Sequence, residues 1–168
     1  MTDSRPAGTQ PETVGGREPS AYSVIVVEDD ENEVFLLKRA FQEAQVKNPV
    51  LLFRDGQAVI DYLSRLGTNG GQISDAPPAL MLLDLKTPRK TGLEVIEWVR
   101  AQPVLKRVVV VLMSSSDYAG DVNRAYDLGC NSYLLKPFGF DRLVEMVKLL
   151  DRYWLQTNQK ASTKLPTG

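Results

Sequence analysis

The sequence predicts an α/β fold: a doubly wound, five-stranded parallel sheet with five helices. Apolar runs rich in Val, Ile and Leu alternate with stretches of helical periodicity, which is typical of βα units. One run, Ala79–Leu83, has no polar residue, as expected for a strand that helices cover on both faces. A chain of 168 residues suffices for one compact domain and not comfortably for two. Right-handed crossovers should join the strands.

The five predicted strands are apolar runs bounded by polar or turn-forming residues. In chain order they are Tyr22–Val27, Pro49–Arg54, Ala79–Leu83, Val108–Met113 and Asn131–Leu135. The turn pair Asp55-Gly56 ends the second of them.

A helix is predicted after each strand. Asp30 can cap the first helix and Glu33 stands at its capping-box position. The spacing of its apolar residues defines a buried stripe of Val34, Leu37, Phe41 and Ala44. The second helix carries Val59, Leu63 and Leu66 and should stop at Gly67. The other three are predicted at Gly92–Ala101, about Tyr118–Leu128, and Phe140–Leu155.

Both ends of the chain are predicted to lie outside the folded domain, which should span residues 21–155. Residues 1–20 are rich in Thr, Pro, Gly and charge and indicate a disordered arm. Residues 156–168 have the composition of a flexible polar tail. Residues 67–78, rich in Gly, Asn and Pro, should form a surface loop, and they lack the GK[S/T] ending of a phosphate loop.

The composition excludes several classes of protein. With 20 basic and 21 acidic residues the net charge is −1, so nothing indicates nucleic-acid binding. No apolar stretch approaches the ~20 residues of a membrane span, and the chain start lacks the apolar core of a secretion signal. The only cysteine, Cys130, cannot form an internal disulfide and suits the cytoplasm, where we expect the protein. The absence of His excludes His-based catalysis and metal sites.

Four polar signatures follow four of the predicted strands directly. They are Glu28-Asp29-Asp30, Asp84, Ser114-Ser115-Ser116 and Lys136-Pro137. If the strands are parallel, their C-terminal ends gather carboxylates, a hydroxyl and an ammonium group in one crevice, where ligands bind in open α/β sheets. Carboxylates suit a hard divalent cation, and a cation together with Lys and Ser suits a phosphoryl group.

Each signature also has a simpler reading. Helix capping explains Asp30, but two further acids at a strand end repel each other unless a cation neutralises them, which favours a metal site. Asp84 could be a turn former, or a nucleophile that forms an aspartyl phosphate beside Mg²⁺. Ser114 could be a helix cap, and Lys136 a solvated surface lysine. A cis peptide bond before Pro137 is one way to turn that lysine inward.

The ordered set of residues resembles the receiver domain of two-component response regulators, over about Tyr22 to Leu155. The resemblance implies a flavodoxin-like fold with strand order 2-1-3-4-5. The elements that carry it are Glu28-Asp29, Asp84 with Pro88 and Gly92, Ser114-Ser115, and Lys136-Pro137-Phe138.

The resemblance also implies a role for each site residue. Asp84 matches the phosphoacceptor, and Asp29 and the backbone carbonyl of Lys86 match direct Mg²⁺ ligands. Glu28 would act mainly through a bound water. Lys136 matches the lysine that contacts the phosphoryl group, Ser114 the switch hydroxyl, and Tyr133 the aromatic that swings inward with it. Because this chain has no His, a histidine kinase or a small phosphodonor must supply the phosphoryl group.

The wider pattern is similar to the short regulators of phytochrome-type histidine kinases, which lack an effector domain and tend to dimerise. Two residues depart from the family pattern: Thr87 replaces an apolar residue, and Lys86 places a charge beside the path of a hydrolytic water. The similarity to the phytochrome regulators rests on Val27-Glu28-Asp29, Arg54-Asp55-Gly56, Leu82-Leu83-Asp84-Leu85, Pro88-Arg89-Lys90 and Trp154-Leu155.

Output should pass through protein contacts, to a downstream partner or a phosphotransfer protein. The last helix carries a second apolar area, which is either part of a wide core face or a homodimer patch of helix 4, strand 5 and helix 5. That area comprises Met146, Leu149, Tyr153 and Trp154.

Two other functions compete with this one. One is a receiver-like scaffold that ignores phosphorylation. The other is a Mg²⁺-dependent phosphatase of the haloacid dehalogenase type, which needs a second acid where this chain has Lys86. We therefore do not expect an enzyme.

Overall fold

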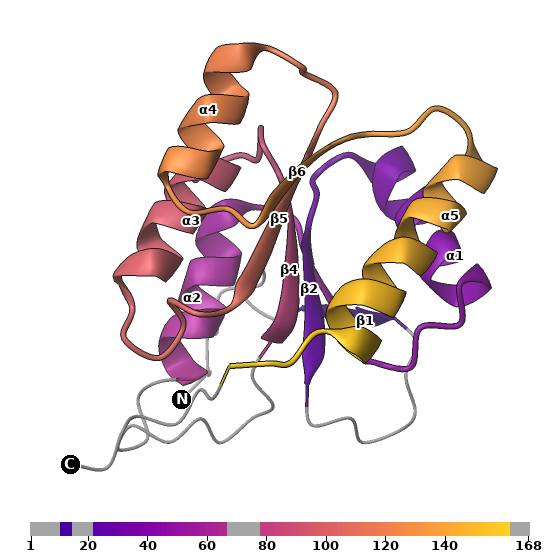
Figure 1. The fold of residues 1–168 in the computed structure, drawn as a ribbon, viewed down its shortest axis with the longest axis horizontal. Coiled ribbons are helices and arrows are strands. Elements are labelled where there is room, and N and C mark those ends of the chain that lie inside the picture. Colours follow the sequence, from indigo (N-terminus) through magenta and orange to yellow (C-terminus); the bar gives the residue numbers. More distant parts are fainter. Residues whose placement is uncertain (1–10, 15–21, 67–77, 162–168) are drawn as a thin grey trace, which may run out of the picture.

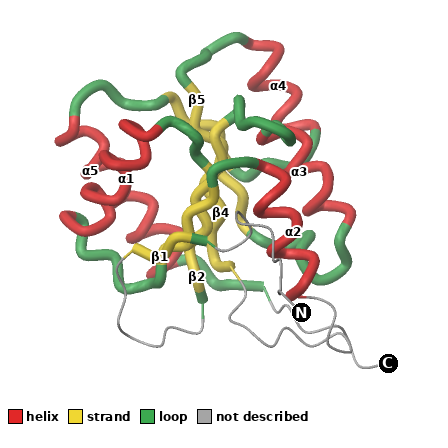
Figure 2. The backbone as a smooth tube through the Cα atoms, turned by 180° about the vertical axis from the view of Figure 1, so that it is seen from behind, coloured by secondary structure: helices red, strands yellow, loops and turns green. Residues whose placement is uncertain are grey.

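The computed structural model describes residues 11–14, 22–66 and 78–161, which form a sheet of six strands with helices on both faces (Figures 1 and 2). Strand order across the sheet is β1-β3-β2-β4-β5-β6. The strands are β1 (Glu12–Val14), β2 (Ser23–Val27), β3 (Val50–Phe53), β4 (Pro78–Asp84), β5 (Val109–Ser114) and β6 (Ser132–Leu135).

Two layers of helix enclose the sheet. Helices α1 and α5 cover one face, and α2, α3 and α4 cover the other (Figures 1 and 2). The helices are α1 (Glu31–Glu43), α2 (Gly56–Leu66), α3 (Gly92–Ala101), α4 (Ala119–Asp127) and α5 (Phe140–Leu150), followed by the π-helical segment η1 (Asp151–Thr157). Each face of the sheet has its own apolar core, and β4 is buried along nearly its whole length, as its uninterrupted apolar sequence predicted.

The five predicted strands pair in parallel, in the order expected for the receiver fold. The register pairs Val27 with Leu83, Asp84 with Met113, and Ser114 with Leu135. The predicted fold class is therefore confirmed, and the four polar signatures emerge at one edge of the sheet.

A sixth strand, β1, lies in the segment predicted to be disordered. Glu12–Val14 pair antiparallel with β3, and Val14 is buried against the α1/α5 core. Glu12 also forms an ion pair with Lys38 of α1. The prediction of disorder is wrong for these residues, because three residues with one apolar side chain give no periodic signal and the strand exists only through pairing with β3. The remainder of 1–20 lies outside the described residues.

The folded part of the chain also extends past Leu155. The regular α-helix ends at Leu150, and η1 continues to Thr157 with Leu155 buried in the core. The Lys160 ammonium lies 5.3 Å from the centre of the Tyr22 ring and donates to the Leu155 carbonyl at 2.9 Å. The predicted tail at 156–168 is therefore wrong for 156–161, since these contacts are tertiary and leave no trace in composition.

Other predictions are confirmed or lie outside the described residues. Asp30 caps α1, accepting from the backbone amides of Asn32 and Glu33, each at 2.9 Å. The predicted stop at Gly67 and residues 67–77 of the predicted loop lie outside the described residues, and Pro78, predicted as the last loop residue, instead begins β4. No helix in the described part of the chain is long and apolar enough to cross a bilayer.

Candidate functional site

Lys136 stands at the centre of the predicted site. Its Nζ lies 2.8 Å from Oε2 of Glu28 and 3.2 Å from Oδ2 of Asp84. The backbone amide of Lys136 donates to the Ser114 carbonyl at 2.9 Å, which continues the β5–β6 ladder and aims the side chain across the strand ends. With 14% of its side chain exposed, Lys136 is not the solvated surface lysine of the simpler reading. The described residues contain no cis peptide bond, so a cis Pro137 plays no part.

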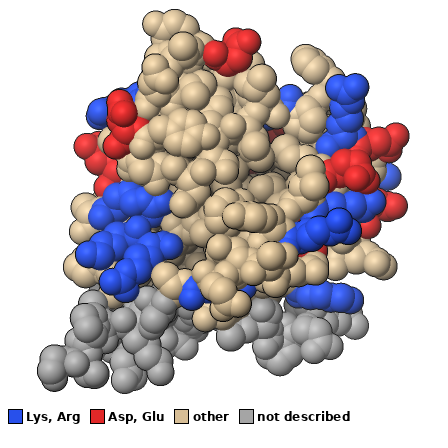
Figure 3. Space-filling view, in the orientation of Figure 1, with Lys and Arg blue, Asp and Glu red and all other residues tan. Residues whose placement is uncertain are grey.

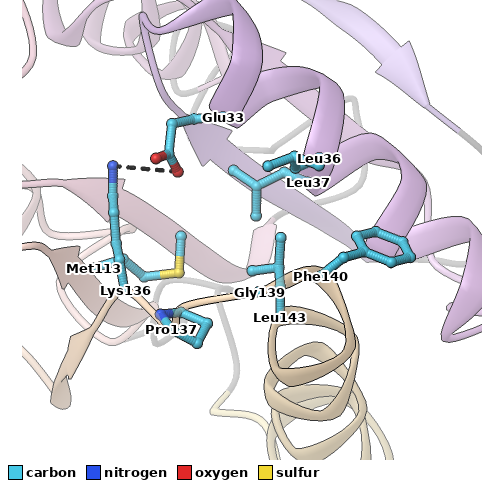
Figure 4. A pocket seen from close by; sticks show the side chains of 9 residues that line it. All are labelled: Glu33, Leu36, Leu37, Met113, Lys136, Pro137, Gly139, Phe140 and Leu143. Carbon is cyan, nitrogen blue, oxygen red and sulfur yellow. Dashed lines mark ion pairs between the residues drawn. The ribbon is translucent and has the colours of Figure 1, made fainter.

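A third carboxylate, that of Glu33, lies 3.7 Å from the Lys136 ammonium (Figure 4). Sequence reasoning assigned Glu33 to a capping box, which needs its side chain to accept from the Asp30 amide. That amide donates instead to Oε1 of Glu28 at 3.1 Å. The capping-box assignment is wrong because the Asp30 amide already has Glu28 as its acceptor. The one sequence signal for the contact between Glu33 and Lys136 is an acidic residue in the first turn of α1.

Three acids form a candidate metal centre. One carboxylate oxygen each from Glu28, Asp29 and Asp84 lie within 4.8 Å of one another. Glu28 is buried, Asp84 half-buried and Asp29 exposed, so the cluster has a closed floor and an open side. Carboxylate oxygens are the ligands that Mg²⁺ and Ca²⁺ prefer, and the residues present fit a hard divalent cation. Lys86 lies at the rim, with its amide 3.3 Å from Oδ1 of Asp84.

The electrostatics of this cluster are strongly coupled. Burial raises the pKa of Glu28, and the nearby Asp84 carboxylate raises it further, while the hydrogen bond from Lys136 opposes both effects. Burial alone would lower the pKa of Lys136, but the Glu28 hydrogen bond and the surrounding carboxylates raise it above its ordinary value. Lys136 therefore stays protonated at neutral pH and is the cationic group in contact with the buried Glu28.

Ser114 is the last residue of β5 and is buried. Its hydroxyl accepts from the Ser116 amide at 3.0 Å, and the Tyr133 hydroxyl donates to the Ser116 carbonyl at 2.8 Å. Ser114 is not a helix cap, since Tyr118 occupies the N-cap of α4. The Ser116 hydroxyl donates to Asp121 in the first turn of α4 at 3.3 Å and accepts from the amide of the N-cap residue Tyr118 at 3.3 Å.

A small cavity of about 90 Å³ opens beside Lys136, between α1 and α5 (Figure 4). Its apolar wall includes Leu37, Met113 and Leu143, and Glu33 and Lys136 stand at its polar end. It is smaller than the pockets that hold drug-sized ligands, so the acidic crevice remains the candidate functional site.

Two contacts that the sequence did not predict anchor the loop between β4 and α3, which follows Asp84. The buried Thr87 hydroxyl donates to the Lys90 carbonyl at 2.5 Å, which satisfies the polar group that replaces the usual apolar residue. A Cβ on Gly92 would lie 2.5 Å from the Asp84 carbonyl oxygen, so only glycine allows α3 to begin this close to the predicted acceptor.

Comparison with known proteins agrees with this geometry. The sequence profile of the family described as "Response regulator receiver domain" matches residues 24–148. The probable methanogenesis regulatory protein FilR2 of Methanothrix harundinacea is 35% identical over 138 residues, which are 82% of this chain and 86% of that protein. Response regulator Rcp1 of Synechocystis sp. is 32% identical over 135 residues, covering 80% of this chain and 89% of that one.

Solved structures give the same result. The phosphorylated cyanobacterial phytochrome response regulator RcpA matches with a TM-score of 0.74 at 32% identity, covering 85% of this chain and 100% of that chain. The Mn²⁺-bound form of Rcp1 matches with a TM-score of 0.71 at 29% identity, covering 84% and 99%. The fold, the ordered site residues and these similarities together place the chain in the response regulator receiver domain family.

Proposed function

We propose that this receiver domain accepts a phosphoryl group on Asp84 from a phosphohistidine of a histidine kinase. The observation that carries the proposal is the position of the Lys136 ammonium, 3.2 Å from Asp84 within a cluster of three carboxylates. In this arrangement a nucleophilic carboxylate, a cation for the phosphoryl oxygens and a set of metal ligands share one open crevice.

The chain's own residues divide the work of phosphoryl transfer. A carboxylate oxygen of Asp84 attacks phosphorus in line, and the bond from phosphorus to the donor's imidazole nitrogen breaks as the new bond forms. Lys136 exchanges its carboxylate partners for the equatorial phosphoryl oxygens and balances the negative charge on them. Ser114 supplies a hydroxyl donor at the end of β5.

Mg²⁺ is the cofactor in this proposal. Asp29, Asp84 and the backbone carbonyl of Lys86 would hold it directly, and Glu28 through water. When bound, the ion supplies positive charge that offsets the clustered carboxylates and the incoming phosphoryl oxygens. The Mn²⁺-bound structure of Rcp1 and the acidic cluster of this chain support a divalent cation.

Phosphorylation adds about −1.5 to −2 charge units at one point. In our proposal the Ser114 hydroxyl leaves the Ser116 amide for the phosphoryl group, and Tyr133 gives up its bond to the Ser116 carbonyl and turns inward. These movements change the surface built from α4, β6 and α5, which is the output of the domain.

That surface also supports a homodimer. Figure 3 shows a largely uncharged centre on the face that carries α4, β6 and α5, with Lys and Arg gathered at its sides. Large apolar side chains are exposed there, and such areas mark interaction sites. They are Tyr126, Leu135 and Leu149, while the exposed Tyr153 belongs to η1. Met146 and Trp154, by contrast, pack against the core, so the apolar area of the last helix is partly core and partly surface.

The remaining assignments extend the same proposal. The kinase would be phytochrome-type, as similarity to RcpA and Rcp1 suggests. The output partner would be a downstream protein or a phosphotransfer protein, with no role for nucleic acid or membrane, and the location would be the cytoplasm. Slow autodephosphorylation would not make the protein an enzyme. The charge of Lys86, exposed at the rim of the site, would set the phosphoryl lifetime.

Intact mass after incubation with acetyl phosphate, with and without Mg²⁺, tests the proposal. We expect a single Mg²⁺-dependent phosphoryl adduct that Asp84→Asn abolishes while the variant keeps the wild-type circular dichroism spectrum. An adduct that persists at full rate in Asp84→Asn would refute the assignment of the acceptor. Complete absence of an adduct, with no binding of beryllofluoride, would favour the phosphorylation-independent scaffold.

A further inference from the structure

The loop from β4 to α3 carries Lys86, and a neighbouring turn fastens it from outside. Residues 85–91 are anchored at their ends, where the Gly92 amide donates to the Leu85 carbonyl at 3.0 Å and the Leu85 amide to Met113 at 3.4 Å. The middle of the loop is held by the turn between β3 and α2. The residues that make this second attachment are Asp55 and Gly56.

One attachment is an ion pair between the two segments. The NH2 nitrogen of Arg89 lies 2.7 Å from each carboxylate oxygen of Asp55. Asp55 also accepts from the Ala58 amide at 2.7 Å at the start of α2, so its carboxylate is fixed before it meets the arginine. Arg89 has a φ of 60°, a conformation unfavourable for a residue with a side chain, which shows that the loop is held in a constrained form.

The other attachment is backbone contact that only glycine allows. The Gly56 amide donates to the Pro88 carbonyl at 3.3 Å, and a Cβ at this position would lie 2.0 Å from the Lys90 carbonyl oxygen. The same Lys90 carbonyl accepts from Thr87 within the loop. Asp55 and Gly56, at the junction of β3 and α2, thus contact three consecutive residues of the loop: Pro88, Arg89 and Lys90.

An ion pair whose arginine is 56% exposed contributes little to folding, so stability alone does not account for these contacts. We propose that Asp55 and Arg89 are positioning residues that hold the β4–α3 loop in the form in which the Lys86 carbonyl can bind a divalent cation next to Asp84. The inference rests on the proposed function, because that function places the Lys86 carbonyl among the metal ligands. Residues that orient ligands from outside the coordination sphere affect metal affinity strongly.

The direction in which Arg89→Gln changes the Mg²⁺ affinity separates positioning from simple electrostatics. Arg89→Gln removes a positive charge near a cation site, so Coulomb's law alone predicts tighter Mg²⁺ binding. Positioning predicts the opposite, a dissociation constant raised about 10-fold. Asp55→Asn is less decisive, because both effects weaken binding.

The experiment is calorimetric titration of the full chain with Mg²⁺ alone, together with the rate of adduct formation from acetyl phosphate. The matched control is Lys90→Gln, which removes an equal charge from the next residue, where Lys90 pairs with Glu94 of α3 at 3.2 Å rather than with the β3–α2 turn. We expect Arg89→Gln to weaken Mg²⁺ binding and slow adduct formation, Lys90→Gln to do neither, and Arg89→Lys to recover part of the loss.

Thermal unfolding in EDTA completes the test. A loss of Mg²⁺ affinity in Arg89→Gln, with a thermal unfolding midpoint in EDTA equal to that of the wild type, supports positioning. Two results overturn the proposal. One is an equal Mg²⁺ dissociation constant for Arg89→Gln and Lys90→Gln, and the other is a lowered thermal midpoint of Arg89→Gln with wild-type Mg²⁺ affinity. If the wild type neither binds Mg²⁺ nor forms an adduct on Asp84, the proposed function itself fails, and the two failures are therefore distinguishable.

Discussion

Lys136 is the residue that contacts most of the charged groups of the site through its ammonium group. It contacts Glu28, Glu33 and Asp84, and the first of these has almost no contact with solvent. Removal of one partner from a buried ion pair leaves the other uncompensated, whereas the pair itself adds little over an apolar replacement. Lys136 is therefore needed by the folded state as well as by the proposed phosphoryl transfer.

We expect Lys136→Met to lower the free energy of unfolding in EDTA by about 3 kcal/mol or more, because Glu28 stays buried without its nearest cation. Urea denaturation measures the change. Lys148→Met is the matched control, since Lys148 pairs with Glu145 on the exposed surface at 3.0 Å; its effect should stay below about 0.5 kcal/mol. Equal effects of the two substitutions would contradict the role assigned to Lys136.

The raised pKa of Glu28 predicts a pH dependence. Because the folded pKa lies above the unfolded value of 4.5, the folded state binds this proton more tightly, and the resulting stability declines as pH rises from 4.5 through the folded pKa. In EDTA we expect Glu28→Gln to lack this decline, so its thermal midpoint gains on the wild type as the pH rises above 4.5. Parallel pH profiles for the two proteins would show that Glu28 is not perturbed.

At the scale of elements, the start of α3 is fitted against the end of β4. A Cβ on Gly92 would lie 2.5 Å from the Asp84 carbonyl oxygen and 2.8 Å from a Leu112 methyl carbon. Gly92→Ala should destabilise the fold by about 1–3 kcal/mol through overpacking, although alanine is the better helix former. It should also slow phosphorylation of Asp84 in the mass assay, because the acceptor's backbone must shift.

Gly120 in α4 supplies the control. There the nearest atom to a new Cβ, at 2.5 Å, belongs to the Tyr118 side chain, which is 68% exposed and can turn away. Gly120→Ala should therefore be neutral or stabilising. If Gly92→Ala is also neutral by urea denaturation, the close approach of α3 to β4 is not a constraint on sequence.

The short strand β1 should contribute measurable stability. Val14 is buried, and Val14→Ala removes two carbon atoms from the core, worth about 1–2 kcal/mol. Thr13 lies on the exposed side of the same strand, so Thr13→Ala should change stability by no more than about 0.5 kcal/mol. Equal effects in thermal unfolding would mean that β1 does not pack on the domain in solution.

For the molecule as a whole, the exposed apolar face of α4, β6 and α5 predicts association. Leu149→Glu places a charge on that face and should convert a dimer to a monomer in sedimentation velocity, with and without beryllofluoride. Phe35→Glu is the control, since Phe35 is similarly exposed but lies on α1. A wild type that sediments as a monomer in both conditions, or a dimer that Leu149→Glu leaves intact, would refute the assignment of this face.

Sequence alone predicted the parallel sheet and the crevice because period and position carry that information directly. The strands are apolar runs, and each polar residue of the site ends its strand or directly follows it, so the topology brings Glu28, Asp84, Ser114 and Lys136 together. The contacts that sequence could not supply are tertiary. Glu33 reaches Lys136 across 103 positions of chain, and β1 exists only because β3 offers an unpaired edge.

The antiparallel direction of β1 has a practical consequence for experiments. Glu12 pairs with Leu52 near the end of β3, whereas Val14 pairs with Val50 at its start, so the chain enters β1 from the side of the sheet that carries the acidic crevice. A fluorophore attached at the exposed Glu12 would therefore report on that edge of the sheet. A fluorophore attached in η1, after a helix that runs back toward the opposite end of the strands, would report on the other edge (Figure 1).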